Sequence, residues 1–196
     1  MNETTAKRRR GAALQTEILE AAWEELAANG YAALTIDAVA KRAQTSRPVL
    51  YRRWADRSQL AVDAIQHYLD QQEVEVPDLG DIRQDMIALM RQYVDRGLPV
   101  VVLCALEMRD YYHETDSQPT DLRKKIIHGE DRALQEVILR AVQRKQIDGS
   151  KLTPRIISVT TDLLRHELTM TLTPPSIKTI EQIVDQIFLP LVRFDD

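Results

Sequence analysis

The sequence is poor in cysteine, glycine and proline, with one, six and eight of these residues among 196. Because Cys104 is alone, an internal disulfide and a cysteine-rich zinc site are excluded, and a reducing cytosol is the expected environment. Few glycines and prolines favour long helices over many-stranded sheets. No run of about 18 apolar residues is present, so we predict no membrane span and a cytoplasmic protein.

The net charge of −4 is unevenly distributed along the chain. Residues 1–70 contain 10 basic and 9 acidic groups, whereas residues 71–196 contain 16 basic and 21 acidic groups. The basic groups of the first part are concentrated in Lys7–Arg10 and Lys41–Arg57. An acidic protein can therefore still present a local basic surface to a nucleic acid.

Apolar residues recur at helical spacing along most of the chain, and no segment shows a convincing strand pattern. We therefore predict an all-α fold of nine helices that follows a polar, basic arm over residues 1–11. The expected ranges are about 12–29, 36–43, a short helix that follows Ser46, 58–72, 81–96, 98–112, 121–146, 154–171 and 176–193.

Residues 35–57 read as two short helices joined by a tight turn. Thr35 is the predicted N-cap of the first helix, and Ser46 is a candidate cap of the second. In the second helix Leu50 and Trp54 are four residues apart, so both point inward as apolar anchors. The opposite side is basic and aromatic, with Arg47, Pro48, Val49, Tyr51, Arg52 and Arg53. Such a helix is suited to a DNA major groove.

Residues 18–65 resemble the DNA-binding domain of the TetR/AcrR family of transcriptional regulators. The resemblance lies in the Gly-Tyr after the first helix, the segment LTIDAVA, the segment SRPVLYR, and Trp54 just before the helix break at Ala55-Asp56-Arg57. It implies a helix-turn-helix DNA-binding domain over 1–57 and a helical ligand-binding and dimerisation domain over 58–196. Gln44 departs from the family, which commonly has glycine in this turn, so we predict an uncommon backbone conformation there.

The resemblance also implies a function and a set of DNA contacts. The expected protein is a homodimeric, ligand-responsive repressor that leaves a pseudo-palindromic operator when a small molecule binds, with neither a cofactor nor catalysis. The predicted DNA-binding residues are Thr35, Thr45, Ser46, Arg47, Pro48, Val49, Tyr51, Arg52, Arg53 and Arg57. Arg47 and Arg52 are suited to guanine, and the hydroxyls and remaining arginines to phosphate. The Lys7–Arg10 arm has two possible interpretations, a contact with DNA and a solubilising tail.

A ligand pocket in the larger domain is likewise implied by the family. Met and Tyr side chains suit an adaptable apolar cavity, although ordinary helix packing explains any single one of them equally well. The candidate lining residues are Met86, Met90, Tyr93, Leu103, Cys104, Met108, Tyr111, Tyr112, His128 and His166. The last two helices are rich in large aliphatic residues, which suits core helices and equally a surface that pairs with a second copy. The two half-sites of a palindrome favour the second interpretation, a homodimer.

The alternative interpretation is an all-α ligand-binding protein or a small helical enzyme, in either case with a vestigial DNA motif. His166-Glu167 begins a metalloprotease-like pattern, but Met170 occupies the position that requires the second histidine. Glu107, Asp110 and His113 have a spacing that can hold a metal, yet such a trio is more often a solvated helix end. We therefore predict neither a metal site nor an enzyme.

Overall fold

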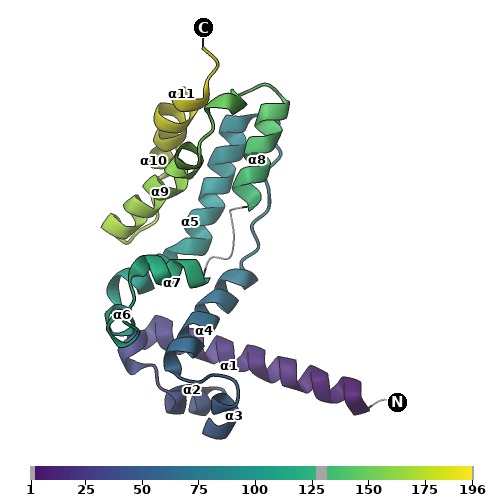
Figure 1. The fold of residues 1–196 in the computed structure, drawn as a ribbon, viewed down its shortest axis with the longest axis vertical. Helices are drawn as coiled ribbons and strands as arrows, with labels where there is room; N and C mark the ends of the chain where they lie inside the picture. Colours follow the sequence, from purple (N-terminus) through teal and green to yellow (C-terminus); the bar gives the residue numbers. More distant parts are fainter. Residues whose placement is uncertain (1–2, 127–131, 196) are drawn as a thin grey trace. The chain divides into compact units, whose positions relative to one another are not determined.

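The computed structural model describes residues 3–126 and 132–195. Within these ranges every regular element is helical, which confirms the all-α fold class (Figure 1). The elements are α1 (Glu3–Ala33), α2 (Ile36–Arg42), α3 (Arg47–Tyr51), α4 (Arg57–Gln71), α5 (Ile82–Leu106), α6 (Arg109–Glu114), α7 (Pro119–Ile126), α8 (Arg132–Gln143), the 3₁₀ turn η1 (Gly149–Lys151), α9 (Pro154–Thr171), α10 (Ile177–Gln182), the π-helical η2 (Ile183–Phe188) and α11 (Leu189–Val192).

Two compact units, each built from two stretches of sequence, make up the chain. The first unit comprises Met1–Gln72 and Leu103–His128, and the second comprises Glu73–Val102 and Gly129–Asp196. Helices α6 and α7 thus pack with the N-terminal helices, while α5 contributes to both units. The predicted functional boundary after Arg57 stays a prediction.

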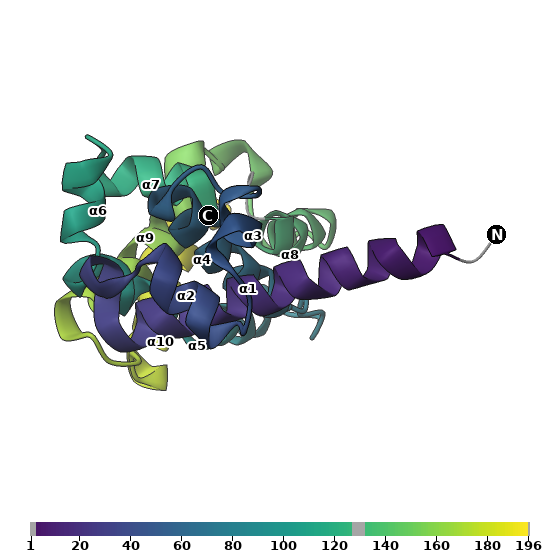
Figure 2. The same cartoon turned by 90° about the horizontal axis from the view of Figure 1, so that it is seen from below.

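In the first unit, α1 packs against α2, α4 and α6, and α4 also packs against α7 (Figure 2). These helices are held together because each places an apolar side on a shared core, and burying that area is the main stabilising term. The fully buried residues of this core include Ile18, Leu26, Tyr31, Leu34, Leu50, Leu60 and Ile65.

Gly30 interrupts α1 with a φ of 73° and a ψ of 175°. The prediction that the helix breaks at Asn29-Gly30 is therefore confirmed, although one further turn extends to Ala33. The positive φ favours glycine at this position, whereas the nearest atom to an added Cβ, a carboxylate oxygen of the exposed Glu107 side chain at 2.5 Å, could move aside. The next residue, Tyr31, donates its backbone N–H to the Glu107 carbonyl oxygen at 3.3 Å.

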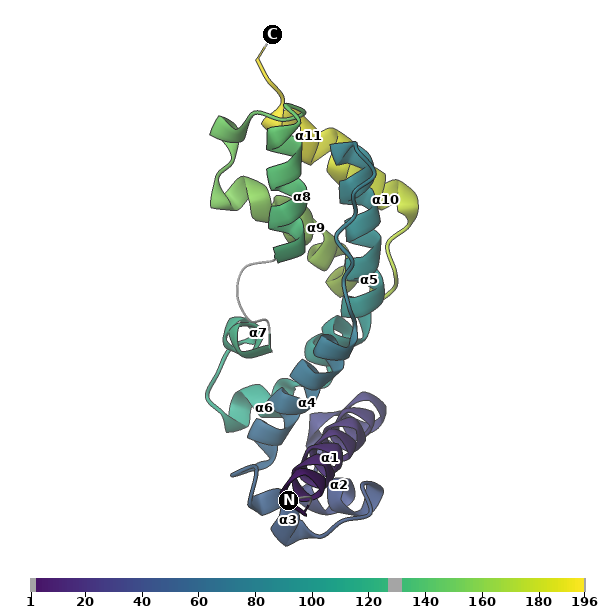
Figure 3. The same cartoon turned by 90° about the vertical axis from the view of Figure 1, so that its right-hand side faces the viewer.

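The second unit has its own core between α5, α8, α9 and the C-terminal run from α10 to α11 (Figure 3). Its buried residues recur at helical spacing on each of these elements, so every helix contributes one apolar side. They include Met86, Leu89, Val137, Ile138, Leu164, Leu168, Val184 and Phe188.

Several predicted helix boundaries are wrong. α1 begins at Glu3 rather than Ala12, because residues 3–10 contain no glycine or proline and are rich in good helix formers. α5 continues through Gly97 and Pro99, where we predicted a break. The burial of Val94, Val100 and Leu103 along this helix offsets the local cost of those two residues. The predicted helix over 121–146 consists of α7 and α8, and the residues between them lie outside the described ranges.

The predicted C-terminal helix is continuous but not uniform. The wider π-helical turn η2 ends at Phe188, two residues before Pro190. Proline has no backbone N–H for the carbonyl of residue 186, and in a regular α-helix its ring would clash with that carbonyl. A π-helical turn is one way to accommodate such a residue without ending the helix.

Candidate nucleic-acid interface

Helix α2 is fixed at its start by Thr35, as predicted. The Thr35 side-chain oxygen accepts a hydrogen bond from the backbone N–H of Ala38 at 3.0 Å, and Asp37 stands in the first turn. Arg42 at the other end donates to Glu25 at 3.0 Å and to Glu24 at 3.1 Å. These bonds tie the end of α2 to α1, so the position of α2 is set from both ends.

The turn between α2 and α3 contains Gln44 with a φ of 48°, which confirms the predicted uncommon conformation. The N–H of Thr45 donates to the carbonyl of Ala40 at 2.9 Å, and the N–H of Gln44 donates to that of Lys41 at 3.3 Å. This pair of bonds is the Schellman arrangement, which satisfies the last carbonyls of a helix. Ser46 occupies the N-cap position of α3, but its hydroxyl makes no cap hydrogen bond.

Leu50 and Trp54 are 0% and 2% exposed, which confirms that both are buried anchors. Leu50 lies in α3, but α3 ends at Tyr51, so Trp54 follows the helix rather than belonging to it as predicted. We call residues 47–54 the recognition segment. The indole N–H of Trp54 donates to Asp63 of α4 at 2.9 Å. The other oxygen of Asp63 accepts from the Gln59 amide at 2.7 Å. Asp63 therefore fixes the tryptophan ring at the end of the recognition segment, a role that sequence reasoning missed.

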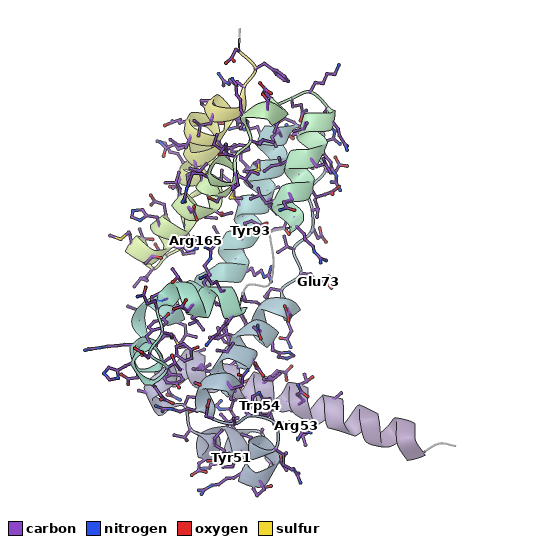
Figure 4. All side chains as sticks on the ribbon, viewed as in Figure 1. Tyr51, Arg53, Trp54, Glu73, Tyr93 and Arg165 are labelled. Carbon is purple, nitrogen blue, oxygen red and sulfur yellow. The ribbon has the colours of Figure 1, made fainter. Side chains whose placement is uncertain are left out.

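On the other side of α3, the side chains reach solvent. Tyr51 is 58% exposed, although it is a large aromatic residue (Figure 4). An exposed tyrosine between arginines on a short helix is poorly explained by packing, but it suits contact with a phosphate or a base. Thr45 and Val49 are half-buried, and the remaining exposed residues of this surface are Ser46, Arg47, Pro48, Arg52 and Arg53.

Two arginines of this surface have partners within the helix-turn-helix itself. Arg47 forms an ion pair with Asp37 of α2, in which both side chains are more than half exposed. Arg53 donates to the Val49 carbonyl at 3.3 Å. Exposed ion pairs contribute about 0.2–1 kcal/mol, so Arg47 can exchange Asp37 for a nucleic-acid group at low cost.

Arg57, a predicted phosphate contact, is bound by other residues of the protein. It donates from Nε to Glu114 of α6 at 2.9 Å, and its guanidinium lies 4.6 Å from the centre of the Tyr31 ring. These hydrogen bonds keep the pKa of the Glu114 carboxyl below its ordinary value. The carboxylate is therefore charged at neutral pH, and the ion pair between α4 and α6 is intact.

Two family models match the chain over most of its length. "Bacterial regulatory proteins, tetR family" matches residues 18–64, which hold α2, α3 and the start of α4. "Tetracyclin repressor-like, C-terminal domain" matches residues 76–187, more than half of the chain. The chain belongs to the TetR family. It is a transcriptional regulator with a DNA-binding helix-turn-helix.

Individual relatives are similar to this chain over most of their length. The DNA-binding transcriptional repressor TetR of Mycobacteroides abscessus is 27% identical over 186 residues, which cover 94% of this chain and 96% of that protein. An uncharacterized HTH-type transcriptional regulator of Mycobacterium tuberculosis is 26% identical over 182 residues, which cover 90% and 86%. The crystal structure of the TetR family transcription regulator SCO0332 has a TM-score of 0.63 at 21% identity and covers 89% and 96%, which shows the shared fold.

The predicted ligand residues are divided between the two units. Met86 and Met90 lie in the core of the second unit, with Tyr93 packed against it (Figure 4), and His166 is exposed on α9. His128 lies outside the described residues. The remaining five, which belong to the first unit, are Leu103, Cys104, Met108, Tyr111 and Tyr112.

Burial raises the pKa of the Cys104 thiol to about 11. The thiol is therefore protonated at neutral pH and is a poor nucleophile, which agrees with an inert packing role.

Two surface clefts lie within the first unit. One, of about 360 Å³, has the stacked rings of Trp23 and Tyr68 in its wall, with centroids 4.0 Å apart. The other, of about 400 Å³, is lined by α4 residues together with Tyr111 and Lys125. Of the predicted ligand residues, Tyr111 thus reaches a cleft.

Within the described residues, no group of three or more histidine, cysteine or acidic side chains is arranged to hold a metal ion. None of the helices in residues 3–126 and 132–195 combines the length and hydropathy of a membrane span.

Proposed function

We propose that this TetR family regulator is a homodimeric repressor that reads a pseudo-palindromic operator and leaves it when a small molecule binds. The observation that carries the DNA-binding part is the two-sided α3 segment. Leu50 and Trp54 are buried on one side, while Arg47, Tyr51 and Arg52 are exposed on the other. A rigidly anchored helix with exposed arginines is what major-groove reading requires.

Each predicted DNA contact has a chemical role in this proposal. Arg47 and Arg52 donate to guanine O6 and N7, and Pro48 and Val49 contact thymine methyl groups. The phosphates are bound by hydroxyls and by the remaining arginine of this surface, with Thr45 at the edge of the contact. The phosphate-binding residues are Thr35, Ser46, Tyr51 and Arg53, and Arg57 is suited to the same contact once it is free of Glu114.

The exposed apolar residues of the second unit support a dimer through the last helices. Ile187 and Leu191 of the C-terminal run are 40% and 44% exposed, and Met170 near the end of α9 is 70% exposed. Ile187 and Leu191 are four residues apart on one helical run, so they share one side of it, and neighbouring exposed apolar side chains favour an interaction surface. A twofold dimer also supplies the two recognition helices that a palindrome needs.

Release by a small molecule rests on family membership and on differential binding. In this proposal residues 1–57 bind DNA, and residues 58–196 bind the effector and the second copy. A ligand can release DNA only to the extent that it prefers a conformation whose two recognition helices no longer fit successive major grooves.

Selection of bound DNA from a random pool tests the proposal with the full-length protein. We expect an inverted repeat whose half-sites are about one helical turn apart or more. Affinity for a selected fragment should fall by about 10³–10⁵ between 50 and 200 mM salt, as is usual for 6–10 phosphate contacts. Recovery of no common sequence, together with a flat salt dependence, would contradict the proposed function.

The dimer surface has its own test, the substitution Leu191→Glu. A charge placed in an apolar interface is costly to bury, so the variant should be a monomer at micromolar concentration while the wild type is a dimer. Leu139→Glu is the matched control, because Leu139 is 51% exposed on α8 of the same unit. Sedimentation velocity distinguishes the two states. A dimeric Leu191→Glu variant would show that this surface is not the interface.

A further inference from the structure

The guanidinium of Arg57 is surrounded by partners from three segments of the first unit. Nε and Nη2 donate to the same Glu114 oxygen, Oε2, at 2.9 and 2.5 Å, and Nη1 donates to the Leu34 carbonyl at 3.3 Å. The face of the guanidinium lies over the Tyr31 ring. Three of its five N–H groups are therefore engaged before any DNA is present.

Glu114 is brought to Arg57 by the packing of α6 against α1. Tyr111 of α6 places its ring edge against Tyr31 at a centroid distance of 5.3 Å. Glu114 follows on the same short helix, so its side chain reaches the start of α4 across 57 residues of sequence. Tertiary packing of α6 against α1 therefore places the Glu114 carboxylate beside Arg57.

Asp56, the other carboxylate next to Arg57 in sequence, has a different task. It caps α4 by accepting from the Gln59 N–H at 2.9 Å and from the Ser58 hydroxyl at 2.6 Å. The carboxylate that pairs with the arginine is therefore that of Glu114.

A carboxylate and a phosphate compete for the Nε/Nη2 edge of a guanidinium, and Glu114 occupies that edge of Arg57. The Arg57 side chain is 30% exposed and that of Glu114 is 38% exposed, so solvent and an approaching phosphate can reach both. We propose that Glu114 is a positioning residue that withholds Arg57 from the DNA backbone. This inference rests on the proposed DNA-binding function.

The arrangement gives the regulator an adjustable phosphate contact. In a conformation that moves Glu114 away from Arg57, each protomer gains one contact between Arg57 and a DNA phosphate. By linkage, DNA binding favours that conformation. A helix outside the helix-turn-helix thereby affects operator affinity without touching the DNA.

The substitution Glu114→Gln tests the proposal because it removes the charge and keeps the shape. With a fragment selected as above, the dimer should gain two phosphate contacts. Its affinity loss between 50 and 200 mM salt should then be roughly tenfold larger than that of the wild type. Asp110→Asn, an equal charge change at an exposed position of the same helix, should leave the salt dependence as in the wild type.

The substitution Arg57→Gln distinguishes an effect of Glu114 through Arg57 from an effect of altered packing at Glu114. If Glu114 acts through Arg57, then Arg57→Gln and the double variant Arg57→Gln/Glu114→Gln should have equal salt dependences. A Glu114→Gln variant with the wild-type salt dependence, or a gain that persists without Arg57, would overturn the inference alone. A wild-type protein without salt-dependent DNA binding would overturn the proposed function and this inference with it.

Discussion

Replacing Trp54 with alanine is expected to lower the free energy of unfolding by about 3–5 kcal/mol, the usual cost of truncating a buried tryptophan. The ring is 2% exposed and closes the core beneath the recognition segment. Its removal also leaves one oxygen of Asp63 without the indole N–H that it accepts at 2.9 Å. A partly buried acceptor that loses its partner adds to the cost of the cavity.

Urea unfolding followed by circular dichroism measures this loss. Trp54→Phe separates the two causes, because it keeps most of the volume and removes only the indole donor. Its cost should be about 1–3 kcal/mol. Trp23→Phe is the matched control, since Trp23 is half-buried and stacks on Tyr68. A Trp54→Ala variant that unfolds at the wild-type urea concentration would show that the ring does not anchor the segment.

The helix-turn-helix could be predicted from the sequence because its determinants are local. A cap such as Thr35 acts within three residues, and the anchors Leu50 and Trp54 are separated by one helical turn. The strained turn was predictable for the same reason. The tight geometry demands a positive φ whatever residue is present, and Gln44 adopts 48°. Local chemistry and the global fold therefore agree in this stretch.

The partners of these residues could not be predicted, because they are set by tertiary packing. Trp54 pairs with Asp63 of the next helix, and Arg57 pairs with Glu114, which lies 57 residues away. A single sequence contains no signal that selects Glu114 from the chain's 30 acidic residues. The same limit applies to the candidate pocket, whose members are assigned to two units by the fold rather than by any spacing.

Helix boundaries were mispredicted where a local breaker competes with burial. Gly97 and Pro99 favour a helix end, yet α5 continues through both. Val94 and Val100 on either side are 4% and 6% exposed. The burial of such side chains contributes about 1.5–3 kcal/mol each, which is comparable with the cost of a proline inside a helix. Propensity alone cannot decide such a balance.

Substituting Arg47 with alanine is expected to cost about 1–3 kcal/mol of operator affinity in each half-site and to relax specificity at one base pair. The reason is the loss of two hydrogen bonds to one guanine. The structure adds a complication, because Asp37 pairs with Arg47 and would be left unpaired near the DNA backbone. The unpaired Asp37 carboxylate should repel the DNA phosphates whatever the base sequence. Part of the measured loss of affinity is therefore independent of base recognition.

The double variant Asp37→Asn/Arg47→Ala isolates base reading from this repulsion. Relative to Asp37→Asn alone, it should lose affinity for the selected half-site and tolerate all four bases at the contacted position. Repeating the pool selection with both proteins measures the change directly. Arg53→Ala is the matched control, since a phosphate contact should weaken all sequences alike and reduce the salt slope by about one per head. An unchanged base preference in the double variant would make Arg47 a phosphate contact and leave Arg52 as the guanine reader.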